Sequence, residues 1–125
     1  MRLLLDTHVF LWAITDSRKL KQAARRAIQT AEEVHVSAAS IWEIAIKTGL
    51  GRLDGDARAM LAAIAASGFR ELPVSGRHAA GVQRLPSYHG DPFDRLLIAQ
   101  AMAEPLHLMT ADPVLARYSE LVLLV

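Results

Sequence analysis

Four acidic residues stand at positions where carboxylates could do chemistry. Asp6 directly follows the apolar run Leu3-Leu4-Leu5, and Asp112 follows Leu108-Met109-Thr110-Ala111. Glu43 lies among apolar residues, and Asp94 comes directly after Asp91-Pro92-Phe93. If these carboxylates are brought together, they cannot all stay ionised without a counter-charge. A hard divalent cation supplies that charge, and Mg²⁺ favours carboxylate and water oxygens.

Each of these carboxylates also has an ordinary structural interpretation. Several could cap or complement the amino end of the helix that follows: Asp6, Asp91, Asp94 and Asp112. Glu43 could instead form a helical ion pair with Lys47, because the lysine stands four residues on in the favoured orientation. The spacing alone leaves both interpretations open at every position.

Short apolar strands alternate with helices along the chain. Strands are expected over residues 2–5, 34–37, 69–74, 106–110 and 121–125. Helices, with their capping residues, are expected over residues 7–14, 16–31, 37–48, 54–68, 75–85, 92–103 and 113–118. This alternation predicts an α/β fold of three layers, with a mostly parallel sheet of about five strands and helices on both faces.

The predicted sheet gathers the acidic residues at one edge. Asp6 and Asp112 follow the first and fourth strands, so both lie at carboxyl ends, where ligands of such sheets bind. Glu43 comes about one turn after the second strand ends, and its side chain can reach back to the same edge. Asp94 is expected in the first turn of a helix that otherwise buries Leu97, Ile98 and Met102.

The composition narrows the chemistry of such a site. The chain has no cysteine, which excludes thiolate zinc sites, thiol nucleophiles and disulfides, and it lacks His-x-x-x-His and His-x-Glu spacings. Mg²⁺ or Mn²⁺ is therefore expected rather than zinc. A metal held by carboxylates activates water and clamps a phosphodiester, so the pattern indicates a nuclease. Glycine-rich phosphate loops are absent.

The length indicates one domain, residues 1–125. The protein is expected in the cytoplasm. The 125 residues are 52% hydrophobic and carry a formal net charge of +1. No apolar run approaches the roughly 20 residues of a membrane helix, and Asp6 comes too early for a signal peptide. A basic segment stands out, formed by Arg18, Lys19, Lys21, Arg25 and Arg26. It could be a solvated helix face or a phosphate-binding surface.

The acidic motifs together resemble those of PIN domains, and in particular of VapC-type toxins of toxin–antitoxin pairs. The resemblance covers nearly the whole chain. It is carried by Asp6-Thr7, Ser40-Ile41-Trp42-Glu43-Ile44 with Lys47, His89-Gly90-Asp91-Pro92-Phe93-Asp94-Arg95, and Thr110-Ala111-Asp112. Each piece is weak alone, and the joint pattern in this order is specific. This chain has His8 where many members carry Asn after the acid-Thr pair.

The resemblance implies a metal-dependent ribonuclease toxin. The acids that match the family's metal ligands are Asp6, Glu43, Asp94 and Asp112, and they would hold Mg²⁺ or Mn²⁺. In that family a hydroxyl residue beside the last acid often joins the metal site, and in this chain that residue is Thr110. The resemblance also implies an RNA substrate, a homodimer, and inhibition by a cognate antitoxin that reaches over the acidic pocket.

Several neighbouring residues could contact the substrate or support the acids: Thr7, His8, Lys47, Asp91, Arg95 and Thr110. His8 and His89 are expected near the acidic edge without binding the metal, and Arg95 could contact phosphate or pair with an acid. His35 and His107 are expected to be ordinary strand residues. The two tryptophans, Trp12 and Trp42, are expected in the core or in a dimer interface.

Two other classes of protein compete with the nuclease. A phosphatase could use Asp6 as nucleophile, but such sites usually have a second acid two residues on, where this chain has His8. A non-catalytic module with an acidic pocket, such as a phosphoacceptor receiver or an inactive PIN domain, shares the layered architecture. A receiver would lack a buried acid like Glu43 and would not need Asp94.

Overall fold

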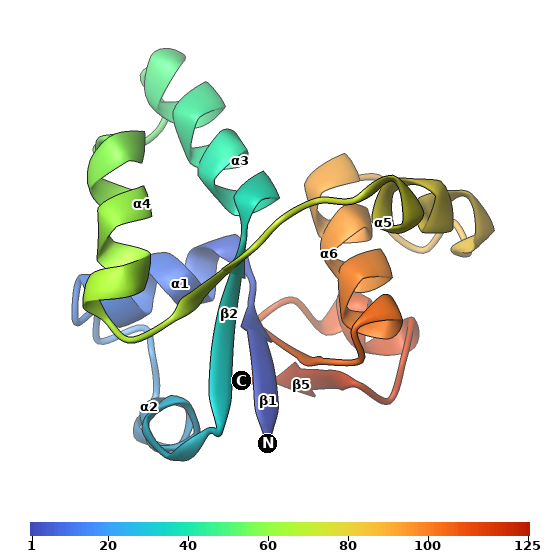
Figure 1. Ribbon diagram of the computed structural model, residues 1–125, viewed down its shortest axis with the longest axis horizontal. Coiled ribbons are helices and arrows are strands. Elements are labelled where there is room, and N and C mark those ends of the chain that lie inside the picture. Colours follow the sequence, from blue (N-terminus) through green and yellow to red (C-terminus); the bar gives the residue numbers. More distant parts are fainter.

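A five-stranded parallel sheet forms the middle layer of the protein in a computed structural model, which describes all residues 1–125 (Figure 1). The strands are β1 (Arg2–Leu5), β2 (Glu33–Ser37), β3 (Arg70–Leu72), β4 (His107–Thr110) and β5 (Val122–Leu124). Their order across the sheet is β3-β2-β1-β4-β5, and all four neighbouring pairs are parallel. The predicted strand content and direction are therefore confirmed.

Helices cover both faces of this sheet, as Figure 1 shows. One face carries α1 (Thr7–Ile14), α2 (Gln22–Thr30), α3 (Ala38–Gly49) and α4 (Ala57–Ala66). The other carries α5 (Gly76–Gly81), the 3-10 turn η1 (Val82–Arg84), α6 (Pro92–Ala103) and the 3-10 helix η2 (Pro113–Arg117). The three-layer α/β architecture is as predicted. No helix combines the length and apolarity that a membrane crossing requires.

Two apolar cores, one on each face of the sheet, hold the layers together. Along β1, Leu3 and Leu5 belong to the core under α1–α4, and Leu4 belongs to the core under α6. This alternation follows from the two-residue period of a strand. All three leucines are fully buried, which explains why the strand reads as a continuous apolar run.

The strand order creates the point where a site can form. The chain moves from β1 to β2 on one side and later returns to place β4 on the other side of β1. The carboxyl ends of β1, β2 and β4 therefore meet at one edge, beside a topological switch point. The backbone N–H of Asp6 donates to the carbonyl of Met109 at 3.0 Å, which ties the ends of β1 and β4 together.

Some predicted boundaries and burials are wrong. The second helix starts at Gln22 after Lys21, and Asp16 adopts a positive φ of 53° instead of capping it. The third strand is shorter than predicted, Arg70–Leu72. Met102 lies on the solvent side of α6 and is 48% exposed, although Leu97 and Ile98 on the same helix are buried as predicted.

Candidate metal centre and active site

Asp6 occupies the first position after β1 and is buried. Its Oδ1 accepts a hydrogen bond from the Val9 backbone N–H at 2.8 Å, so it caps α1 as one interpretation predicted. Burial raises the pKa of this carboxyl, and the negative charge of Glu43 adds to the rise, whereas hydrogen bonds with Thr110 and Val9 oppose it. A capping carboxylate with a raised pKa carries negative charge that its surroundings compensate incompletely.

Glu43 has both carboxylate oxygens occupied. The residue lies on α3 and is 4% exposed. Its Oε1 accepts from the Thr7 hydroxyl at 2.7 Å, and its Oε2 lies 2.7 Å from the ammonium of Lys47. The hydroxyls of Thr7 and Ser40 lie 2.9 Å apart. The helical ion pair is confirmed, and the same carboxylate is linked to the residue that follows Asp6.

Asp91 caps α6 and so places Asp94. The Oδ1 of Asp91 accepts from the backbone N–H groups of Phe93, at 2.8 Å, and Asp94, at 3.1 Å. Pro92 occupies the first helical turn, where its missing N–H costs nothing. Asp94 therefore stands one turn into α6 with its carboxyl partly buried.

The pKa of Asp94 is raised from 3.8 to about 7. Burial is the largest cause, followed by the negative charges of Asp91, Asp6 and Glu43, whereas His89 lowers the value. Like charges at close range disfavour ionisation of a carboxyl. Lys47 compensates the charge of Glu43, but the other carboxylates outnumber the positive charges beside them, and a divalent cation bound by oxygen ligands would supply what is missing. This uncompensated charge and an oxygen-rich donor set without thiolates fit Mg²⁺ or Mn²⁺.

Asp94, Asp112 and His89 form a compact group of potential ligands, which includes neither Asp6 nor Glu43. The Nε2 atom of His89 lies 2.9 Å from Oδ2 of Asp112 and 3.5 Å from Oδ2 of Asp94. Potential ligand atoms of these three residues all lie within 4.8 Å of one another. Asp112 also caps η2, because its Oδ1 accepts from the Val114 N–H at 3.0 Å. The Thr110 hydroxyl accepts from the Asp112 N–H at 3.1 Å.

His89 was predicted near this edge, but its contact with the acids was not. Its Nδ1 accepts from the backbone N–H of Asp91 at 3.0 Å, so the ring proton sits on Nε2 and points at Asp112. The only sequence signal was its place at the start of the His-Gly-Asp-Pro-Phe-Asp stretch. That signal does not reveal that the loop returns to the end of β4.

Arg95 pairs with no acid. Its guanidinium donates to the carbonyls of Pro86, at 2.8 Å, and Val82, at 3.2 Å. Three longer contacts reach the carbonyls of Leu85 and His89 and the Tyr118 hydroxyl. The predicted pairing with an acid is therefore wrong. Arg95 instead fastens the loop that carries His89.

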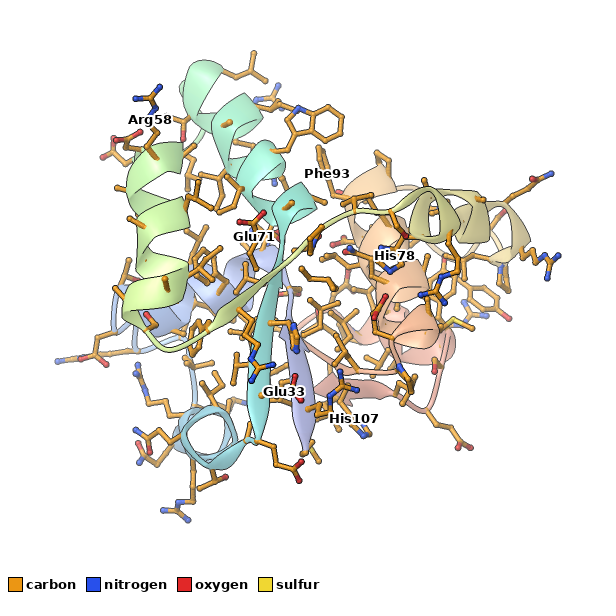
Figure 2. The ribbon with its side chains drawn as sticks, viewed as in Figure 1. Glu33, Arg58, Glu71, His78, Phe93 and His107 are labelled. Carbon is orange, nitrogen blue, oxygen red and sulfur yellow. The ribbon has the colours of Figure 1, made fainter.

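Trp42, which was expected in the core or in a dimer interface, is 61% exposed and outside the core. Its ring contacts Phe93 edge to face, with the ring centroids 5.2 Å apart. Figure 2 shows Phe93 at the start of α6, directed toward α3. His8 is exposed and its charge lowers the pKa of Asp6, but it is outside the potential ligand group. His35 and His107 lie in strands β2 and β4, as predicted.

Comparison with known proteins gives one consistent result. The sequence model of the PIN domain matches residues 3–121. Ribonuclease VapC22 of Mycobacterium tuberculosis is 34% identical over 117 residues, which cover 87% of this chain and 85% of that protein.

Solved structures share the fold at lower sequence identity. A toxin–antitoxin complex from Klebsiella pneumoniae matches with a TM-score of 0.68 and 18% identity, over 97% of this chain and 95% of that chain. VapC20 of Mycobacterium tuberculosis, a toxin that cleaves the sarcin–ricin loop, matches with a TM-score of 0.65 and 18% identity, over 94% and 97% of the two chains.

Proposed function

This chain belongs to the PIN-domain family, and on that premise we propose that it is a divalent-metal-dependent endoribonuclease, the toxin of a toxin–antitoxin pair. The observation that carries the proposal is the acidic cluster in which Asp94 has a pKa of about 7 beside Asp6 and Glu43. Such a cluster is costly for a protein that binds no cation, because each carboxylate raises the energy of its neighbours. The named relative supports ribonuclease as the activity.

The metal, Mg²⁺ or Mn²⁺, is proposed to bind to Asp6, Asp94 and Asp112, with Glu43 and the Thr110 hydroxyl alongside. When bound, it would activate a water molecule and neutralise charge on the phosphate. The overall reaction is hydrolysis, in which the water oxygen bonds to phosphorus and one phosphorus–oxygen ester bond breaks.

The chain's own residues set the geometry of these ligands. The Nε2–H of His89 fixes one oxygen of Asp112. Asp91 fixes the first turn of α6 and with it the position of Asp94. Thr7 and Lys47 hold the two oxygens of Glu43. Each contact limits the rotation of a carboxylate, and such preorganisation is what a site of this kind needs.

The proposed partners follow from the relatives. The Klebsiella pneumoniae structure is described as a toxin–antitoxin complex, so a cognate antitoxin that covers the acidic pocket is the expected inhibitor of this chain. We extend the proposal to a homodimer that acts on RNA in the cytoplasm. The buried Glu43 favours this function over a phosphoacceptor receiver, which would lack such an acid.

The test is cleavage of total cellular RNA by the purified full-length chain. Reactions contain Mg²⁺ or Mn²⁺, with chelator in parallel, and compare the wild type with Asp94→Asn. Asp54→Asn is the matched control, because it makes the same change at an exposed loop position outside the cluster.

Metal-dependent cleavage that is lost in Asp94→Asn and kept in Asp54→Asn is the expected result. Cleavage that persists in chelator, or equally in both variants, would contradict the proposed site. Growth arrest upon expression of the wild type, but not of Asp94→Asn, would reveal a nuclease that is selective for one RNA. The absence of both cleavage and arrest would indicate an inactive PIN domain.

A further inference from the structure

Tyr88 presents an aromatic ring to solvent in a fixed orientation. It lies in the loop between η1 and α6 and is 41% exposed. The guanidinium of Arg117, at the end of η2, lies 4.1 Å from the centre of its ring. The Tyr118 ring packs at its side, with centroids 5.1 Å apart and an interplanar angle of 58°. The two neighbours hold Tyr88 in place while part of it stays accessible.

This pair is built from the same two segments that supply the acidic site. Tyr88 directly precedes His89, whose imidazole donates to Asp112. The backbone N–H of His89 donates to the Tyr118 hydroxyl at 2.9 Å. Asp112 caps η2, and Arg117 is the last residue of that 3-10 helix. The Tyr88–Arg117 pair is therefore connected to the acidic site through two short segments that are hydrogen-bonded to each other.

Arg117 is available to an anion, whereas Lys47 and Arg95 are engaged within the protein. Arg117 is exposed and forms no ion pair. Lys47 is engaged by Glu43, and Arg95 is engaged by backbone carbonyls. A polyanion that approaches a cluster of carboxylates experiences repulsion, which a free cation at the rim reduces. Arg117 supplies such a cation at the end of the 3-10 helix that Asp112 caps.

An exposed aromatic ring with a guanidinium over one face, where the guanidinium pairs with no acid, is chemistry suited to an unpaired nucleotide. Aromatic rings and arginine planes stack on exposed bases, and the guanidinium also binds phosphate. We propose that Tyr88 and Arg117 form a subsite that binds one unpaired nucleotide of the RNA next to the cleaved bond. The proposal rests on the proposed function, and it assigns to these two residues the contact with one unpaired base beside the site. A base paired in a duplex keeps its faces stacked and cannot use Tyr88.

The experiment measures binding apart from cleavage, with every variant made in the full-length Asp94→Asn background. The probe is a fluorescein-labelled 20-nucleotide RNA of mixed sequence without self-complementarity, used single-stranded and annealed to its complement. Fluorescence anisotropy gives Kd as salt is varied. Variants are Tyr88→Leu, Tyr88→Phe and Arg117→Gln. Arg58→Gln on α4 is the control, because this exposed arginine, labelled in Figure 2, loses the same charge on a helix of the opposite layer.

Stacking predicts a specific pattern. Tyr88→Leu raises Kd for the single strand about tenfold, in the range of aromatic–base stacking, and leaves duplex binding within about twofold. Tyr88→Phe keeps the ring and stays within about twofold of its parent. Arg117→Gln weakens binding of both probes and reduces the slope of log K against log salt for the single strand by about 0.7. Arg58→Gln changes neither slope nor single-strand preference.

Several results would overturn the subsite. These are an unchanged single-strand Kd in Tyr88→Leu, an equal loss on the duplex, or no RNA binding by the parent protein. Dissociation of an oligomer in Tyr88→Leu, seen by light scattering, would assign the ring to a protein interface instead. If Tyr88→Leu lowers the thermal midpoint greatly, its loss of RNA binding reflects unfolding. The binding of Tyr88→Phe and Arg117→Gln then decides whether the subsite exists. Tyr88-dependent binding combined with wild-type protein that never cleaves RNA would overturn the nuclease and leave the subsite standing.

Discussion

His89 and Asp112 are joined by a hydrogen bond of 2.9 Å between Nε2 and Oδ2, although 23 residues separate them in the sequence. The contact closes the loop before α6 onto the end of β4. It also brings a nitrogen atom within reach of the carboxylates. Because Nδ1 of His89 already accepts from Asp91 and Nε2 carries the proton, His89 orients Asp112 rather than binding the cation, and this role has a measurable consequence.

We expect His89→Ala to weaken Mn²⁺ binding about tenfold or more, since loss of a partner that orients a metal ligand typically costs 10- to 100-fold. Isothermal titration of Mn²⁺ into the metal-free protein measures this. His8→Ala is the control, because His8 is near Asp6 but outside the potential ligand group. Equal Mn²⁺ affinities for His89→Ala and the wild type would remove His89 from the site.

The pKa of Asp94 predicts that the site destabilises the metal-free fold. Between pH 4 and 7 the folded protein keeps a proton that the unfolded chain has released, so stability falls as pH rises toward about 7 and then levels off. The shift corresponds to about 4 kcal/mol before screening, and we expect about 1–2 kcal/mol at this partly exposed carboxyl.

Asp94→Asn should therefore be more stable than the wild type at pH 8 in chelator and equal to it near pH 4. Thermal unfolding across this pH range is the measurement. Saturating Mn²⁺ should reverse the order, because the ion stabilises only the protein that binds it, by about 2.7 kcal/mol at a hundredfold excess over Kd. A less stable Asp94→Asn at pH 8 would mean that Asp94 is chiefly structural.

How far the sequence predicted this structure depends on the range of the interactions involved. The strand that precedes Asp6 and the cap at Asp91 are local features, and both were predictable from apolar runs and capping chemistry. The contact of His89 was not, because it depends on where a loop returns in space. The predicted start of α2 was wrong for a related reason. Asp16 resembles a cap but instead pairs with Arg25, nine residues on.

The Glu43–Lys47 pair gives a third prediction. Lys47→Met leaves the buried Oε2 of Glu43 without its partner, and we expect a loss of about 1–3 kcal/mol in unfolding free energy. Adding Glu43→Gln removes the uncompensated charge and should restore part of the loss. Urea unfolding of the two single variants and the double variant measures the coupling. Strictly additive effects would show that the pair is energetically silent.

Arg95 should stabilise the loop through its planar guanidinium rather than through its charge. Arg95→Lys keeps the charge but cannot supply the same set of donors to the carbonyls of Pro86 and Val82. We expect a loss of about 1–3 kcal/mol and faster amide hydrogen exchange over residues 82–91. Arg84→Lys, exposed at the end of η1, is the matched control. Unchanged exchange in Arg95→Lys would show that the loop is held by other contacts.

The last prediction concerns Glu104, which follows α6 far from the acidic site. Its pKa is lowered from 4.5, first by the hydrogen bond from His78 and then by the charges of His78, Arg77 and Arg2. A lowered carboxyl pKa stabilises the fold fully above the unfolded value and loses that contribution as pH falls through the folded one. Glu104→Gln should therefore be less stable than the wild type at pH 7, and the difference should shrink below about pH 4.5.

Thermal midpoints from pH 3 to 7 measure this difference. The control is Glu120→Gln, because Glu120 is exposed and forms no ion pair. A difference that stays constant across this range would show that folding does not shift the pKa of Glu104, because only such a shift makes the difference depend on pH.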